Sequence, residues 1–398
     1  MSGPEWVDST DALETQWEAL ADRVGAAPWL RPGWFRAWMG AFGEGSLACL
    51  VLRENDGVRA LVPVLRHRAA IVSPTNWHSP GFCLLAEDAA ARRALVEALL
   101  EHTNGRLALS FLGAEDARVL RDCAGERRTL TRVIARSPYV ELGREALSKN
   151  TRRNLRRARR RLASLGDVAL EIIADEEGLE HALEVGFAVE AAGWKGRQRT
   201  AISSDPKTRR FYEELGRWSA ARGTLRLFLL RVEGQAVAFE FGLQEGKRLY
   251  DLKGGFDERF ARASPGTLIT EAMLRYGTQQ DLSTLEFLGD AEQWKLRWAT
   301  GVRECHQVQV FGRGAAAAVQ WIAHAHARPL ARKLRSRRGA LIWRSEQCIE
   351  GIDRSLESSR PPGFCAQLVD LTPPRRVDRR DARQRLHHSR LNMVARSA

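Results

Sequence analysis

The stretch from residue 249 to residue 301 constrains the fold more than any other part of the chain. It reads LYDLKGGFDERFARASPGTLITEAMLRYGTQQDLSTLEFLGDAEQWKLRWATG. Residues 248–252 predict a strand that ends at two glycines, and a charged loop follows. Apolar residues then recur at helical spacing as far as Gly277, and residues 284–288 predict the next strand. The order strand, helix, strand favours a mixed α/β arrangement.

Ser264, Pro265 and Gly266 predict where the helix begins. Ser264 is a suitable N-cap, and Pro265 stands where a missing N–H costs nothing. Small residues at this end leave backbone N–H groups pointing outward, in front of the positive end of the helix dipole. The segment is therefore a candidate pyrophosphate cradle. An ordinary capped helix after an ordinary loop has the same signs.

Three further stretches join this one in carrying a resemblance to a known family. They are WLRPGWFRAWMGAF at residues 29–42, LSKNTRRNLRRARRRLASLG at 147–166 and EAAGWKGRQRTAI at 190–202. Together with the Ser-Pro-Gly helix and the GDAEQWK segment that follows it, they resemble the CelD/BcsL group of acyltransferases, FemAB-like members of the GNAT superfamily. The resemblance covers roughly residues 28 to 312. It implies two tandem GNAT-like halves, each a mixed, largely antiparallel sheet flanked by helices.

We expect three parts along the chain. Residues 1–146 form the first half, where Asp56-Gly57 marks a hairpin turn between two strands. Residues 147–313 form the second half, which carries the presumed donor site, and its strands 225–232 and 235–244 read as a second hairpin. Residues 314–398 form a basic tail, predicted to be helical to about Ala327 and disordered after about Ser358.

The net charge of +13 belongs mostly to the tail. Residues 314–398 hold 17 of the Lys+Arg and 7 of the Asp+Glu, so the tail carries +10 and the preceding residues only +3. The body is nearly balanced, and the overall charge is therefore no argument for a nucleic-acid partner.

Cysteine spacing and hydropathy exclude several classes of site and location. The six cysteines lie apart, without a C-x-x-C pair, and predict reduced thiols and no metal site. The N-terminus has no basic region followed by an apolar one, and no segment approaches the ~20 apolar residues of a membrane span. We expect a cytoplasmic protein of unknown oligomeric state.

A predicted helix at residues 149–161 carries the sharpest local charge, with eight basic residues and no acidic one. Leu155, Ala158 and Leu162 can face a core while the arginines point outward. The arginines fit a solvated helix, the phosphates of a coenzyme or nucleotide-linked substrate, or an RNA backbone, and the sequence leaves these alternatives open.

Acyl transfer from a thioester needs few special residues, because the thioester is already activated and the enzyme mainly positions two substrates. The resemblance implies acyl-CoA as co-substrate, without a metal, and places Arg262, Ser264, Gly266 and Thr267 at its phosphates. The usual GNAT phosphate loop, Q/R-x-x-G-x-G/A, is incomplete here, since the loop has one glycine. That departure leaves an aminoacyl-tRNA donor open, whereas the lack of a sustained heptad run favours coenzyme A.

Glu240 is the candidate general base, because it interrupts the apolar strand AVAFEFGL. A carboxylate there is either desolvated or paired with a cation, unless this face of the strand is open to solvent. The resemblance carries the family's lysine near the reaction centre onto Lys295, as the group that stabilises transition-state charge, together with Asp290 from the same motif. It also implies that Trp194, Lys195 and Tyr250 lie on the substrate side. His78 lies in a loop that could line a cleft, and alone it is weak evidence of catalysis.

The predicted function is transfer of an acyl group, most simply acetyl, from acyl-CoA to an amine or hydroxyl of a small molecule or polysaccharide precursor. One alternative is a Fem-type transferase that uses aminoacyl-tRNA. Another is a non-catalytic scaffold of the same fold in an exopolysaccharide synthase complex, attached through its basic tail.

Overall fold

The computed structural model of the protein describes residues 3–8, 10–55, 57–67, 70–143 and 147–327. The α-helices are α1 (Glu14–Arg23), α2 (Pro32–Phe42), α3 (Ala89–Glu101), α4 (Ala114–Ala124), α5 (Lys149–Ala163), α6 (Leu179–Ala191), α7 (Trp194–Arg197), α8 (Pro206–Ala221), α9 (Pro265–Gln279), α10 (Gln293–Leu296) and α11 (Ala315–Ile322). The strands are β1 (Glu5–Val7), β2 (Leu47–Glu54), β3 (Gly57–His67), β4 (Ala70–Val72), β5 (Leu85–Ala86), β6 (Arg106–Leu112), β7 (Thr129–Glu141), β8 (Val168–Ile173), β9 (Leu225–Val232), β10 (Gln235–Glu245), β11 (Arg248–Phe256), β12 (Thr284–Glu286) and β13 (Gly301–Phe311).

All thirteen strands of these described residues belong to one sheet. Its order is β1-β2-β3-β4-β6-β13-β7-β12-β11-β10-β9-β8, and β5 pairs with β3 off this path. Most neighbours are antiparallel, whereas β4 with β6 and β11 with β12 are parallel. The predicted mixed α/β fold, with a mostly antiparallel sheet flanked by helices, is confirmed.

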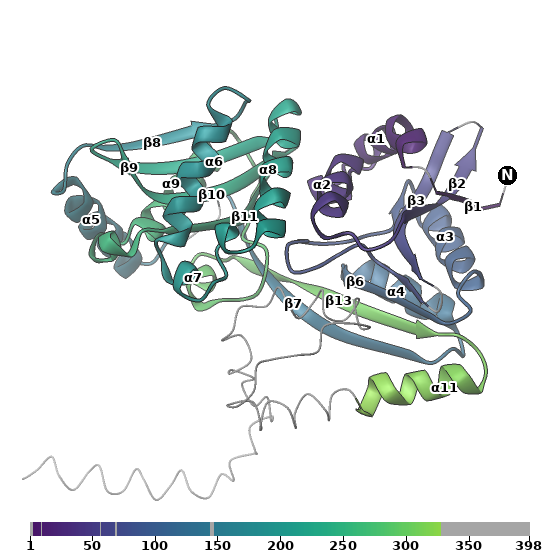
Figure 1. The fold of residues 1–398 in the computed structure, drawn as a ribbon. Helices are drawn as coiled ribbons and strands as arrows, with labels where there is room; N and C mark the ends of the chain where they lie inside the picture. Colours follow the sequence, from purple (N-terminus) through teal and green to yellow (C-terminus); the bar gives the residue numbers. More distant parts are fainter. Residues whose placement is uncertain (1–2, 9, 56, 68–69, 144–146, 328–398) are drawn as a thin grey trace, which may run out of the picture. The chain divides into compact units, whose positions relative to one another are not determined.

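The two longest neighbours, β7 and β13, join the sequence halves (Figure 1). β13 comes from the predicted second half but lies between β6 and β7 of the first. β7 in turn pairs with β12 at its far end, Glu141 opposite Thr284. Strands from each side of the predicted boundary at residues 146 and 147 therefore pair with strands from the other side. The three-part division stays a prediction.

Among the residues that the structure describes, three apolar cores lie against the sheet. In the first half, Trp17 of α1, Leu95 of α3 and Leu120 of α4 share one core with β2, β3 and β6. In the second half the two faces of β9 and β10 belong to different cores, because side chains alternate along a strand. One face packs against α6 and α8, and the other against α5 and α9.

Helix α2 of the first half packs on α8 of the second. The ring of Trp34 lies 5.3 Å from that of Phe211, edge to face. A Cβ on Gly33 would overlap the Trp218 indole, so only glycine permits this approach of the two helices. The WLRPGWFRAW stretch therefore builds part of the contact between the halves.

Arg31 adds a buried charge to the same junction. Its guanidinium is 3% exposed and lies 2.6 Å from Glu18 of its own half and 2.7 Å from Glu245 of β10. A buried guanidinium needs such partners, because removing a charge from water is costly.

Several predicted element boundaries were wrong for identifiable reasons. The strand at 248–252 continues through Gly254 and Gly255 to Phe256, since Gly254 lies opposite Glu240 and leaves room for that carboxyl. A last strand, predicted from its apolar alternation at residues 307–311, begins at Gly301 instead, because β7 supplies partners from Gly301 to Val310. The strand at 284–288 ends at Glu286.

The end of the chain is described only in part. The predicted helix 315–327 is present as α11 and a further turn to Ala327. The rest of the predicted basic tail, from residue 328 on, with the disorder expected after Ser358, lies outside the described residues. No helix in the described ranges is long and apolar enough to cross a bilayer, and the four cysteines within them are free thiols.

Candidate active site

The parallel strands β11 and β12 separate in the middle of β11. Their pairing runs from Arg248 opposite Thr284 to Tyr250 opposite Glu286, where β12 ends. β11 continues to Phe256, still paired with β10 on its other side. Within the described residues, positions 251–256 of β11 therefore have no strand partner on the β12 side. An unpaired strand edge presents backbone donors and acceptors to a ligand.

Two carboxyl groups face each other where the strands separate. Between Phe241 and Gly242 of β10 the register with β11 shifts, because Leu252 is an extra residue of β11 at this point. Beside this bulge the side chains of Glu240 and Asp251 are hydrogen-bonded to each other. They are 8% and 7% exposed, so both are removed from water.

Burial sets the protonation of this carboxyl pair. It raises the pKa of Glu240 well above its usual range, and the neighbouring Asp251 raises it further. It also raises the pKa of Asp251, to about 6, against the opposing effects of the hydrogen bond from Glu240 and the charges of Lys295 and Lys195. Glu240 therefore holds its proton more tightly than Asp251, and the pair shares one proton in the pH range where Asp251 is ionised and Glu240 is not.

A second buried acid, Glu190 of α6, gathers two lysines beside the free strand edge. Its Oε1 lies 3.2 Å from Nζ of Lys195 and 3.6 Å from Nζ of Lys253, while its Oε2 accepts the N–H of Ile202 at 2.8 Å. Burial lowers the pKa of Lys253 to about 8. Lys195 also donates to the carbonyl oxygen of Gly254. The ammonium group of Lys195 thus already occupies the carbonyl oxygen of Gly254, one of the acceptors on the free edge of β11.

Lys295 and Asp290 hold the loop after β12. Nζ of Lys295 donates to the carbonyl oxygens of Leu288 at 3.0 Å and Asp290 at 3.4 Å, and lies 3.4 Å from Glu292. The carboxylate of Asp290 accepts the N–H of Arg136 on β7 at 3.1 Å. The charge of Lys295 therefore acts on Asp251 of the carboxyl pair, whereas the carboxylate of Asp290 contacts β7 and the N–H of Ala291 in its own loop.

The start of α9 differs from the expected cradle. Ser264 is the N-cap residue of α9, as predicted, but it has left-handed backbone angles (φ 55°, ψ 49°) and makes no capping hydrogen bond through its side chain. The N–H groups of Thr267 and Leu268 both donate to its carbonyl oxygen. Because Pro265 has no N–H, Gly266 is the residue of this first turn whose N–H is left for a ligand. Arg262 is exposed just before the turn.

The two aromatic candidates lie in different surroundings. Trp194 is 37% exposed, with Nζ of Lys195 5.9 Å from its ring centroid. Tyr250 is buried, and its ring meets that of Trp29 edge to face at 4.8 Å. Tyr250 therefore connects the separating strands with the first half of the chain.

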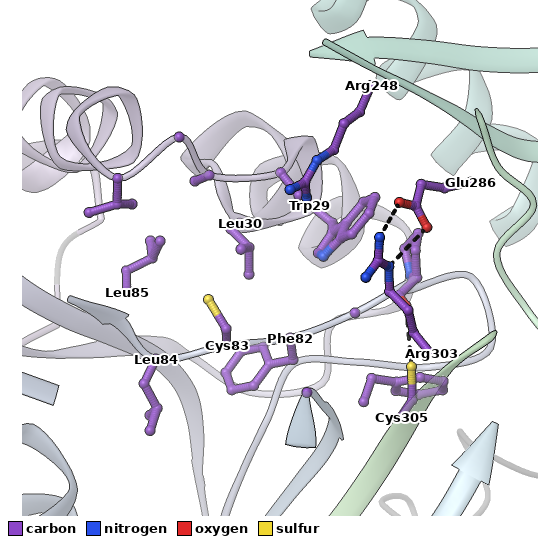
Figure 2. Close-up of a pocket in the computed structure, with 18 of the residues that line it drawn as sticks. Trp29, Leu30, Phe82, Cys83, Leu84, Leu85, Arg248, Glu286, Arg303 and Cys305 are labelled. Atoms are coloured by element: carbon purple, nitrogen blue, oxygen red, sulfur yellow. Dashed lines mark hydrogen bonds and ion pairs between the residues drawn. The ribbon is translucent and has the colours of Figure 1, made fainter. Parts of the chain in front are cut away.

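Tyr250 also lines a cavity of about 640 Å³ (Figure 2). Its walls come from the turn after α1, the segment from Pro80 to Glu87, the start of β11, the end of β12 and the start of β13. The cavity thus reaches Tyr250 and Glu286, the last paired residues before the strands part. A ligand in it would lie at the point where the two strands part.

His78 belongs to the junction between the halves, where burial lowers its pKa to about 3. Its ring stacks on Phe42 at 5.3 Å, and its Nε2 lies 3.4 Å from the hydroxyl of Thr208. A neutral, packed imidazole here agrees with a structural use. Among the described residues no cluster of three or more His, Cys, Asp and Glu side chains could hold a metal ion.

Sequence reasoning missed Asp251, Glu190 and Lys253. The signal for Asp251 is the one that identified Glu240, a carboxylate inside an apolar strand, here between Tyr250 and Leu252. Glu190 likewise interrupts the apolar face of α6. The contact of Asp251 with Glu240 depends on the bulge, and the contacts of Glu190 with its lysines depend on the packing of α6. Neither can be predicted from the order of residues along the chain.

Comparison with protein families gives one match. Residues 149–296 match the family model described as an acetyltransferase (GNAT) domain. This segment contains β11, β12, α9 and the carboxyl pair. The CelD/BcsL group, which the sequence motifs resemble, is not the group that the match names. No curated protein matches the sequence.

Solved structures share the fold over most of the chain. The C-terminal domain of a protein described as a lysylphosphatidylglycerol synthetase, from Agrobacterium fabrum, has a TM-score of 0.51 and 14% identity, covering 80% of this chain and 96% of that one. The L-PGS structure from Bacillus licheniformis has a TM-score of 0.51 and 13% identity, covering 81% and 97%. FemX has a TM-score of 0.50 and 10% identity, covering 77% and 97%. Identities this low establish the fold alone.

Proposed function

We propose that the protein is an acyl-CoA-dependent acyltransferase of the CelD/BcsL type. It moves an acyl group, in the simplest case acetyl, to an amine or hydroxyl of a small molecule or polysaccharide precursor. The observation that carries the proposal is the coincidence of the strand separation at Tyr250 with the Glu240–Asp251 pair. We expect the reaction in the cytoplasm.

The free edge of β11 suits the donor. In the GNAT fold the pantetheine lies between two strands that part, and it pairs with strand backbone. Residues 251–256 supply that edge here, and α9 begins beyond it after the loop 257–264. The N–H of Gly266 and the guanidinium of Arg262 are the groups at that helix start which suit the pyrophosphate. Lys195 would have to exchange its contact with Gly254 for one with the donor.

The carboxyl pair suits the proton transfers of acyl transfer to an amine. The ionised Asp251 takes the amine proton as the nitrogen attacks the thioester carbonyl. The new C–N bond then forms, the C–S bond breaks, and the pair, now holding two protons, returns one to the leaving thiolate. Glu240 keeps the proton of the resting pair and orients Asp251, so the predicted base moves from Glu240 to its partner.

Lys195 and Lys295 are positioning residues in this scheme. Each lowers the pKa of Asp251 through its charge, so the base stays ionised near neutral pH. Lys295 also fixes the loop 288–292 that follows β12. The transition-state role predicted for Lys295 requires it to exchange one of these contacts with the substrate.

Binding and thiol-release assays test the proposal. Acetyl-CoA should stabilise the protein in thermal-shift and calorimetric titrations, and acceptor-dependent release of free coenzyme A should rise as the pH passes about 6. Thr267→Glu should weaken acetyl-CoA binding on the order of tenfold or more, because it places a negative charge at the start of α9 without opposing the helix dipole. Gln279→Glu, at the other end of the same helix, is the matched control.

Glycine 266 is a poorer probe of the same site. A Cβ at this position would lie 2.8 Å from the Phe256 ring, so Gly266→Glu disturbs packing as well as any phosphate contact.

The proposal is contradicted if neither acetyl-CoA nor longer acyl-CoAs stabilise the wild-type protein at millimolar concentration.

An aminoacyl-tRNA donor is the second candidate, and the exposed arginines of α5 favour it. Helix α5 packs through Leu155, Ala158 and Leu162 and is anchored by an ion pair of Arg159 with Glu271, while its other arginines are exposed. Under this alternative, charged tRNA binds with a steep salt dependence and acetyl-CoA does not bind. A scaffold without activity binds neither.

A further inference from the structure

The charges around the cavity next to Tyr250 are balanced, with one exception. Within the described residues most charged side chains of the lining have a partner: Arg23 with Glu87, Arg92 with Asp116, Arg303 with Glu286, and Glu304 with Arg136. Arg248, at the start of β11, has no carboxylate partner among them. Its guanidinium is hydrogen-bonded to Tyr250 instead. The end of the cavity where β11 and β12 part therefore has an excess positive charge.

The rest of the wall is largely apolar. Trp29 and Leu30 come from the segment before α2, and Phe82, Leu84 and Leu85 from the segment before α3. Figure 2 shows the side chain of Arg248 reaching from β11 toward the part of the wall that Trp29 forms. A cavity with apolar walls and one oriented cation at its end is typical of a site for an amphipathic anion.

We propose that this cavity is the acceptor site, and that the acceptor is a small amine or hydroxyl compound with an apolar group and one anionic group, held by Arg248. The size agrees, because about 640 Å³ lies within the range of ligand pockets. Arg248 binds the carboxylate or phosphate through its planar fork, and the side chains from Trp29 to Leu85 receive the apolar group.

The position of the cavity at the separation of β11 and β12 supports this assignment, which rests on the proposed function. Arg248 and Tyr250 lie on the strand that carries Asp251, one to three residues away. Glu286, on the other strand, is the last residue paired with β11. An acceptor anchored at Arg248 is thus held at the point where β11 and β12 part, while the free edge of β11 stays open to the donor.

Direct binding measurements test the site without any donor. The probes are L-phenylalanine, 3-phenylpropionate, 2-phenylethyl phosphate and the uncharged-terminus analogue L-phenylalaninamide, followed by saturation-transfer NMR and calorimetry. We expect the three anionic probes to bind and the amide to bind at least tenfold more weakly. The carboxylate and phosphate probes tell which anion the fork prefers.

Two variants test whether Arg248 is the residue that binds the anionic group of the probes. Arg248→Gln should weaken the anionic probes by about tenfold to a hundredfold, because a hydrogen-bonded charge is lost. Arg217→Gln, an exposed arginine of α8 outside the lining, should leave binding unchanged and is the matched control. Melting curves of both variants check that the fold is intact.

The outcomes separate this inference from the proposed function. Equal binding of the amide, absence of binding by all four probes, or full affinity in a folded Arg248→Gln protein overturns the acceptor site. Binding of the anionic probes by a protein that does not bind acyl-CoA overturns the proposed function and leaves an anion-selective cavity.

Discussion

Replacing Asp251 by asparagine should make the protein more stable and less active, because the native state keeps a carboxylate in an unfavourable place. Burial raises the pKa of Asp251 from 3.8 to about 6. A shift of two pKa units corresponds to about 3 kcal/mol of free energy of unfolding. Asparagine has the same shape and can still accept the proton of Glu240, so it removes the charge and keeps the hydrogen bond.

The direction of the pKa shift determines the pH range in which Asp251 destabilises the native state. The unfolded chain releases the proton near pH 3.8 and the native protein near pH 6, so the native state loses stability between these values and carries the full cost above them. Asp251→Asn should therefore match the wild type below pH 3.8 and exceed it by up to about 3 kcal/mol at pH 8. Urea unfolding at several pH values measures the difference, and Asp281→Asn, an exposed aspartate paired with Lys247, is the control.

Activity should change in the opposite direction. Thiol release by the variant should fall by about a factor of 10² or more and should lose its rise near pH 6, since an amide cannot take the amine proton. An Asp251→Asn protein that is no more stable than the wild type at pH 8 would refute the conclusion that Asp251 is a destabilising buried charge. A variant that keeps the wild-type rate and pH profile would refute its role as base.

Three further predictions concern the neighbourhood of the pair and the end of the body. Lys295→Met removes a charge that lowers the pKa of Asp251, so the rise in activity should move to higher pH, and the melting temperature should fall as the loop after β12 loses its anchor. Gly254→Ala should destabilise the protein by roughly 1–3 kcal/mol, because the new Cβ would overlap the Glu240 carboxyl, and Glu240→Ala in the same chain should restore part of that loss in urea unfolding. Truncation after Gly314 removes His324, whose ring packs on Phe311 at 5.5 Å and whose carbonyl accepts from Arg132, and should lower the melting temperature by on the order of 5 °C relative to truncation after Ala327. Equal melting temperatures would place the end of the stable body at Gly314.

Local sequence signals predicted the elements around the site well, because they depend on neighbouring residues. Helical spacing after Pro265 gave α9, and the turn at Glu233-Gly234 gave the hairpin of β9 and β10. Glu240 stood out as a carboxylate in an apolar strand, and it is buried. Glu240 and the strands and helix around it were predicted from the chain alone, whereas Asp251, Glu190 and Lys253 were missed.

The tertiary structure decided which of these residues meet. The bulge at Leu252 and the glycine opposite Glu240 bring that side chain to Asp251, and neither effect shows in hydrophobic periodicity. β13 pairs with β6 and β7, which lie far from it in the sequence, and this contact depends on burying its apolar face and not on local propensity. The cavity likewise needs Trp29 and Arg248, far apart in sequence, on facing walls. Sequence determined the strands and helices because backbone preference is local, whereas pKa values, cavities and partner choice follow from burial, which exists only once the chain is folded.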